Sequence, residues 1–76
     1  MPASHILSVI LEPQPGGGFT VLVPALPEVV TEGETEREAP ASAEEAIRAV
    51  LQYRLGHGLE IPPDAHPQIR RVTVAA

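Results

Sequence analysis

The chain has 76 residues, of which 43% are hydrophobic and 20% charged, and these proportions fit one small soluble domain, residues 1–76. The absence of cysteine excludes disulfide cross-links, and the formal net charge of −5 disfavours direct binding to nucleic-acid phosphates. With one Phe, one Tyr and no Trp, the chain also lacks an aromatic platform on which single-stranded bases could stack.

Three short strands are predicted in the first half of the chain. Residues 5–11 are rich in aliphatic and β-branched side chains and end at a loop of prolines and glycines, residues 12–18. A second strand follows at residues 19–23, and a third at residues 29–31 ends before Gly33. Because the connections are short, we expect these strands to form an antiparallel meander.

A helix is predicted over residues 43–55, because its apolar side chains recur at steps of three and four residues. Ser42 is the expected N-cap, since Glu45 stands three residues later and can bind the backbone N–H of the cap. Thr35 offers an earlier cap, but Pro40 would then lie inside the helix, where it removes a hydrogen bond. Two glycines are expected to stop the helix, Gly56 and Gly58.

A fourth strand is predicted at residues 69–74, which are again rich in β-branched side chains. A right-handed crossover through the helix would place it parallel to the first strand. The expected fold is therefore α+β, a βββαβ domain whose mixed four-stranded sheet has the order 3-2-1-4, with one helix on one face. The first strand carries apolar side chains on both faces, so we expect a second copy to cover the other face in a dimer or tetramer.

Acidic residues are concentrated in the middle of the chain. Seven glutamates and one arginine between residues 28 and 45 leave a local charge of −6, more negative than the whole chain. Such a patch can dock a basic partner, or it can be a solvated turn and a favourably charged helix start. Both interpretations stay open. The candidate partner-binding residues are Glu28, Glu32, Glu34, Glu36 and Glu38.

No pattern for catalysis or metal binding stands out. The three histidines, His5, His57 and His66, have no ligand spacing, and His57 is expected to bind the last carbonyls of the helix. The chain is therefore expected to hold no metal and no cofactor, and not to be an enzyme. A weaker alternative is a residual hydrolase that uses two carboxylates at strand ends, Glu12 and Glu32.

Several motifs together carry a family resemblance. They are Glu12, the run Gly17-Gly18-Phe19-Thr20-Val21-Leu22-Val23-Pro24-Ala25-Leu26-Pro27-Glu28-Val29-Val30-Thr31-Glu32-Gly33-Glu34-Thr35, the pair Glu38-Ala39, and Ala43-Glu44-Glu45-Ala46-Ile47. This combination resembles the N-terminal domain of HicB-like antitoxins and covers most of residues 6–55. The resemblance implies a partial ribonuclease-H-like fold that has lost catalysis, forms oligomers and neutralises a small HicA-type ribonuclease toxin.

The sequence departs from that family in two respects. Many HicB-like antitoxins continue into a C-terminal DNA-binding segment, which this chain is expected to lack, so we expect no direct binding to nucleic acid. Pro40 stands where the family has an apolar residue, which predicts a shifted or broken helix start.

The expected function is that of an antitoxin-like protein whose partner is a small basic HicA-like toxin. The alternative is a solitary, self-assembling HicB-like module without a toxin. No apolar run is long enough to span a bilayer, and no basic region precedes one near Met1. We therefore expect a cytoplasmic protein without a membrane partner.

Overall fold

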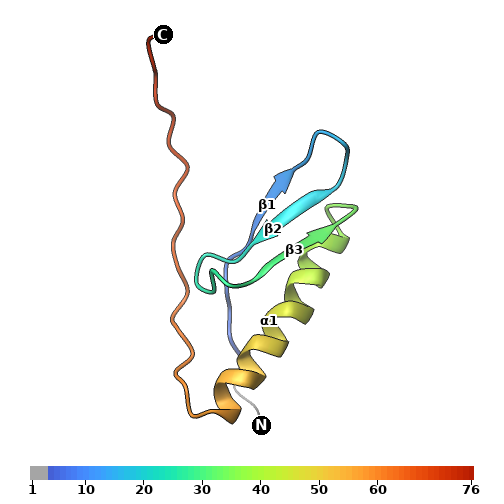
Figure 1. Ribbon diagram of the computed structural model, residues 1–76, viewed down its shortest axis with the longest axis vertical. Coiled ribbons are helices and arrows are strands. Elements are labelled where there is room, and N and C mark those ends of the chain that lie inside the picture. The colour runs from blue at the N-terminus through green and yellow to red at the C-terminus, as the bar shows by residue number, and fades with distance from the viewer. Residues whose placement is uncertain (1–3) are drawn as a thin grey trace.

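The computed structural model describes residues 4–76. Its elements follow the order β1 (Ile10–Pro13), β2 (Phe19–Leu22), β3 (Val30–Gly33) and α1 (Glu38–Gly56). Neighbouring strands pair antiparallel in the order β1-β2-β3, and the helix packs against the sheet, chiefly over β3 and β2 (Figure 1). The predicted α+β class, the three-stranded meander and the single helix are thus confirmed among the described residues.

The core lies between α1 and one face of the sheet. It is aliphatic, because β2 turns Val21 toward the helix and the segment that follows adds Leu26. Small side chains at Ala39 and Ala43 let the first turns of the helix approach the sheet closely. The buried residues are Val21, Val23, Leu26, Val29, Ala39 and Ala43.

The first strand is shorter at its start than predicted. Residues 5–9 lie outside the ladder, although Leu7 and Val9 still pack against the core. Ile10 pairs with Leu22, so a longer ladder would set residue 8 opposite Pro24, which has no N–H to donate. The ladder therefore ends where β2 gives way to this proline.

The helix begins four residues earlier than Ser42, so the predicted cap is wrong. Thr35 accepts a hydrogen bond from the backbone N–H of Glu38 on its Oγ1 at 3.0 Å, and Ser42 lies inside the helix. Pro40 removes one backbone hydrogen bond, to the carbonyl of residue 36, but the helical bond before it still forms, from the N–H of Ala39 to the carbonyl of Thr35 at 3.0 Å. The first turn tolerates the proline, and the helix start is neither broken nor delayed.

The end of the helix follows the prediction. Gly58 adopts a φ of +66° and donates its N–H to Leu55, while Leu59 donates to the carbonyl of Arg54 at 2.8 Å. This pair of bonds is the Schellman motif, which favours glycine at the left-handed position. His57 contacts the carbonyl of Tyr53 through Nδ1 at 2.8 Å, as expected.

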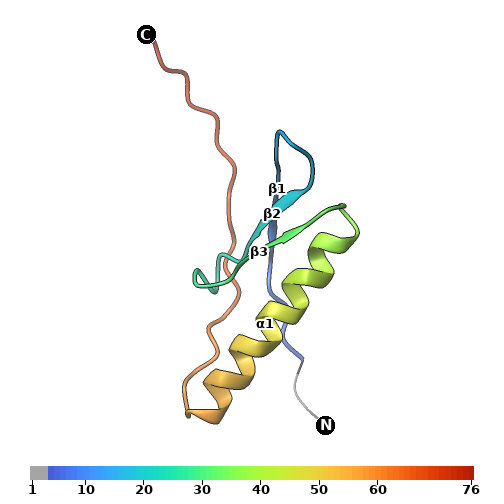
Figure 2. The ribbon, with the colours of Figure 1, turned by 45° about the vertical axis from the view of Figure 1, so that its right-hand side comes forward.

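The predicted fourth strand, residues 69–74, is not part of the sheet. Residues 59–76 form no helix or strand, and residues 66–76 are all exposed. In two views the C-terminus lies beyond the β1–β2 hairpin, away from the sheet (Figures 1 and 2). The observed sheet therefore has three strands, and residues 69–74 are not paired with any of them. No helix within residues 4–76 is both long and apolar enough to cross a membrane.

Candidate partner-binding surface

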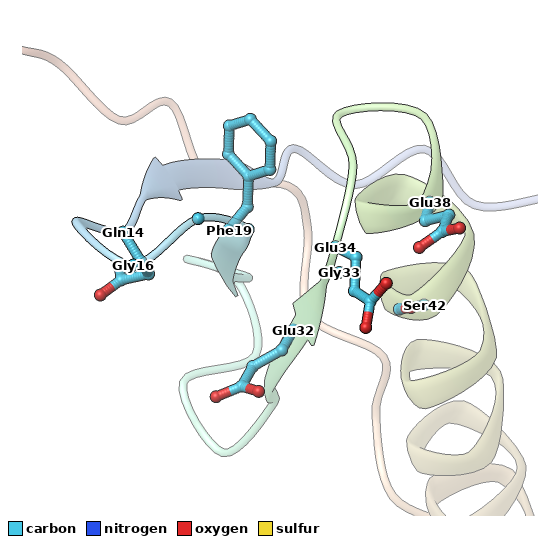
Figure 3. A pocket seen from close by; sticks show the side chains of 10 residues that line it. Gln14, Gly16, Phe19, Glu32, Gly33, Glu34, Glu38 and Ser42 are labelled. Atoms are coloured by element: carbon cyan, nitrogen blue, oxygen red, sulfur yellow. The ribbon is translucent and has the colours of Figure 1, made fainter.

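An open depression of about 720 Å³ lies at the N-terminal end of α1. The β1–β2 hairpin, the end of β3 and the first two turns of the helix surround it (Figure 3). Its lining residues are Gln14, Gly16, Gly17, Gly18, Phe19, Glu32, Gly33, Glu34, Glu38 and Ser42. Three of the five predicted partner-binding glutamates, Glu32, Glu34 and Glu38, are therefore among the lining residues.

The hairpin wall of this depression is shaped by glycine. Gly17 and Gly18 have φ values of +98° and +77°, a region that side chains with a Cβ rarely enter. Gln14 closes the loop, since its N–H binds the carbonyl of Gly18 and its carbonyl accepts the N–H of Gly17, both at 3.0 Å. The glycine run is thus a fixed turn that forms one side of the depression.

The opposite wall depends on a close approach between β3 and the helix. A Cβ at Gly33 would stand 2.5 Å from the Cα of Ala39, a distance that real Cβ atoms do not reach. This contact lets the chain turn sharply between β3 and α1. As a result, the carboxylates of Glu34 and Glu38 point into the same space beside Ser42, while Glu32 extends from β3 farther along the rim (Figure 3).

The negative charge at this end is not balanced by an ion pair. Among residues 4–76 the two ion pairs are Arg48–Glu44 and Arg54–Glu28, so neither involves a glutamate of the depression. Glu36 is exposed on the turn before the helix but does not line the depression. We call Glu32, Glu34 and Glu38, with the depression they line, the acidic end.

Glu28 lies apart from this group. It belongs to the segment between β2 and β3, and its Oε2 accepts a hydrogen bond from Nη2 of Arg54 at 2.9 Å. A backbone hydrogen bond and the bond from Arg54 hold the pKa of the Glu28 carboxyl below its usual value. Arg54 also donates to the carbonyl of Glu60 at 3.2 Å, so this pair joins three segments of the chain.

Asp64 makes a contact that sequence patterns did not predict. Its carboxylate accepts the backbone N–H of Ser8 at 2.7 Å and the Ser8 hydroxyl at 2.8 Å, 56 residues away in the chain. These two bonds are the main reason why the pKa of Asp64 lies below its usual value. A lone aspartate after two prolines gives no periodic signal, so nothing in the sequence identified its partner.

The face of the sheet opposite the helix is open and carries two different rows of side chains. Ile10, Leu22 and Val30 are aligned across the three strands, and Val30 is 61% exposed. The next row on this face contains Glu12 and Glu32 with Thr20 between them. An apolar row and an acidic row thus lie side by side on this face.

Glu12 and Glu32, the carboxylates of the hydrolase alternative, lie on this same face but on two strands that are not neighbours. One strand separates them, which places their Cα atoms roughly 10 Å apart. Among residues 4–76 no group of three or more His, Cys, Asp or Glu side chains is arranged to hold a metal ion. The described residues therefore form no metal centre around this pair.

Comparison with known proteins places the chain beside one small archaeal protein. The chain is 39% identical over 62 residues to the UPF0150 protein Ta0767 of Thermoplasma acidophilum. The alignment covers 82% of this chain and 90% of that protein. No protein-family model matches the chain.

Proposed function

The chain belongs to the UPF0150 family, and from that premise we propose that it is an antitoxin-like binding protein. Its partner would be a small basic HicA-type ribonuclease toxin, whose RNA-cleaving site it covers in the cytoplasm. The partner class comes from the resemblance to HicB-like antitoxins, which is densest between residues 17 and 35.

The acidic end is the observation that carries this proposal. Glu32, Glu34 and Glu38 line one depression and form no ion pair with any of residues 4–76, so their field acts on whatever approaches from solvent. A ribonuclease needs a basic surface to hold RNA, and the same surface is complementary to this end of the chain. Glu36 adds negative charge at the margin, whereas Glu28 has its charge engaged by Arg54.

Capture followed by an activity assay tests the partner. The tagged full chain is incubated with native lysate of its source cells, washed at low salt and eluted with a salt step. A small basic protein is expected in the eluate, and its RNA cleavage is expected to stop when one equivalent of the chain is added. If that protein cleaves no RNA, or cleaves it equally fast with the chain bound, the antitoxin function is wrong.

Charge reversal locates the contact. The Glu32→Lys/Glu34→Lys variant is expected to bind the captured toxin at least ten-fold more slowly at low salt, because steering depends on local charge. The matched control is Glu45→Lys/Glu60→Lys, which changes the net charge equally at exposed positions outside the depression. Equal slowing in both variants would assign the effect to net charge and not to the acidic end.

The proposed role is non-enzymatic. Purified chain with Mg²⁺ or Mn²⁺ is expected to leave RNA intact, because among residues 4–76 no third His, Cys, Asp or Glu side chain joins Glu12 and Glu32 to hold a metal ion. Cation-dependent cleavage that disappears in a Glu12→Gln variant would support the hydrolase alternative instead.

A second candidate is a self-assembling module without a toxin. The apolar row of half-buried Ile10, half-buried Leu22 and exposed Val30 favours it, because two such faces bury each other when copies stack. Recovery of only the chain itself from lysate, at a defined multiple of its mass, would favour this candidate over the antitoxin.

A further inference from the structure

The last eleven residues, 66–76, form an extended arm that leaves the folded body. Every residue of the arm is exposed, whereas Asp64 and Ala65 just before it are half-buried. Both views show the arm continuing past the hairpin (Figures 1 and 2). Among its side chains, Ile69 is 93%, Val72 80% and Val74 77% exposed.

The arm has the composition of a strand and none of its contacts. Residues 69–74 alternate in the extended conformation, so Val72 and Val74 share one face. Apolar β-branched residues at this density are typical of strands that are paired and half-buried. The isolated chain therefore leaves the arm without the pairing for which its residues are suited.

The contact between Asp64 and Ser8 explains why the arm does not pair with its own sheet. This contact places residue 64 beside residue 8, which lies two residues before the start of β1. Both segments are extended and rise about 3.3 Å per residue, so residue 69 stands level with residue 13, where β1 ends. Residues 70–74 consequently lie beyond the sheet.

The stretch of the arm that does lie level with β1 is poorly suited to pairing. Residues 66–69 would face Ile10–Pro13, and this stretch contains Pro67, which has no N–H to donate. A strand in the position predicted from the sequence is thus out of register with its own chain by about one strand length.

We infer that residues 69–74 pair with the free β1 edge of a second copy of this chain, which returns its own arm in exchange. Each copy has one unpaired arm and one free β1 edge, so a two-fold pair satisfies both at once. Val72 and Val74 would extend the apolar row that Leu11 and Val9 begin on the helix side of the sheet. The four-stranded order 3-2-1-4 is then completed between chains.

A second copy fits better than an unrelated protein, because the arm and the edge are two halves of one contact. Exchange of identical segments leaves neither half exposed, whereas a partner that covers only the arm leaves β1 open. The inference does not depend on the toxin, since it concerns the β1 edge and not the acidic end.

Sedimentation equilibrium of the full chain tests the exchange. The unmodified chain is expected to be a dimer, and Val72→Asp and Val72→Pro are each expected to raise the dissociation constant at least ten-fold. Proline tests backbone pairing, since it removes an N–H without adding charge. The helical circular-dichroism signal is expected to be unchanged, because the arm is exposed in the single chain.

The control variant is Val30→Asp, which places the same charge on the open face of the sheet, away from β1. It is expected to leave the dimer intact. If Val30→Asp dissociates the dimer and the two Val72 variants do not, the copies associate through their open faces and the exchange is wrong. A chain that is monomeric at every concentration also overturns it, without bearing on toxin binding.

Cross-linking distinguishes exchange from pairing within one chain. The natural sequence has no cysteine, so a Glu12→Cys/Thr73→Cys variant carries one thiol on β1 and one on the arm. With a short bis-maleimide linker, the expected product runs at twice the chain mass on a denaturing gel. A product that runs as a monomer with both thiols consumed would mean that the arm folds back on its own chain, which overturns the inference.

Discussion

The two ends of α1 treat their charges in opposite ways. At the N-terminal end, Glu34 and Glu38 face an open depression outside any ion pair among the described residues. At the C-terminal end, Arg54 binds the carboxylate of Glu28 at 2.9 Å, and the chain beyond is fixed by Asp64. Glutamates that form one acidic stretch in the sequence therefore divide into two groups. One group has no ion pair among residues 4–76, and in the other Glu28 is bound by Arg54.

The largest effect is expected at the close contact beneath the acidic end. Gly33→Ala places a Cβ 2.5 Å from the Cα of Ala39, which belongs to the backbone and cannot rotate away. Such overpacking is expected to lower the free energy of unfolding by about 2–3 kcal/mol, measured by urea denaturation. The shift of the helix start would also widen the depression.

Gly16→Ala is the matched control for this substitution. Its added Cβ meets no atom within 4 Å, so a change of less than about 0.5 kcal/mol is expected. If the two variants lose equal stability, loss of glycine flexibility and not the contact with Ala39 is responsible. The acidic end would then not depend on the approach of β3 to the helix.

Next in size is the cap of the helix at the same end. Thr35→Ala removes the hydroxyl that accepts the N–H of Glu38, and a loss of about 1 kcal/mol is expected in the same assay. Thr35→Ser keeps the acceptor and is expected to retain most of that stability. Ser42→Ala is expected to cost much less, because Ser42 lies inside the helix. A greater loss of stability in Ser42→Ala than in Thr35→Ala would support the helix start predicted from the sequence, with Ser42 as the N-cap.

The difference between the two candidate caps shows how far sequence patterns determine this fold. Periodicity located the helix and the meander correctly, since both patterns are local. The helix start was misplaced because Pro40 was expected to end the helix, whereas so close to the start it removes one bond, and the bond from Ala39 to Thr35 forms before it. The fourth strand, residues 69–74, was predicted from its composition, but the register that excludes it depends on a contact 56 residues distant.

The candidate site shows the same division. Charge density identified Glu32, Glu34 and Glu38 together, and the turn between β3 and α1 brings them to one depression. The sequence could not separate Glu28 from them, because its partner Arg54 lies 26 residues away. Clusters of charged residues that are close in the sequence are therefore predictable. Whether one of these charges forms an ion pair with a distant residue is not.

At the C-terminal end of the helix a smaller stability effect is expected. Gly58 has a φ of +66°, and alanine at this position is strained in the left-handed region. Gly58→Ala is expected to cost about 0.5–1 kcal/mol, since lower freedom of the unfolded chain offsets part of the strain. Gly56→Ala is the control, because Gly56 has no positive φ and open space around it. Equal losses of stability in the two variants would mean that the left-handed conformation of Gly58 does not stabilise the end of the helix.

The smallest effect is expected from Asp64, and it depends on pH. Hydrogen bonds from Ser8 hold the pKa of this carboxyl below its usual value, so its charged form stabilises the folded chain. The stabilisation is present at neutral pH and is lost as the pH falls through the lowered pKa. The melting temperature of the natural chain is therefore expected to exceed that of Asp64→Asn near pH 7, and the gap should narrow below about pH 4.

Comparison with the variant isolates this one carboxyl, because the other acidic groups titrate in both proteins. Glu34→Asn provides the contrast from the acidic end, where the carboxylate has no ion pair among residues 4–76, and its melting temperature is expected to differ little from that of the natural chain. A gap for Asp64→Asn that stays constant down to pH 2 would mean that the contact with Ser8 does not require a charge. The charge of Asp64 would then stabilise the folded chain no more than the charge of Glu34 does. The difference between the two ends of α1 would depend on the ion pair between Arg54 and Glu28 alone.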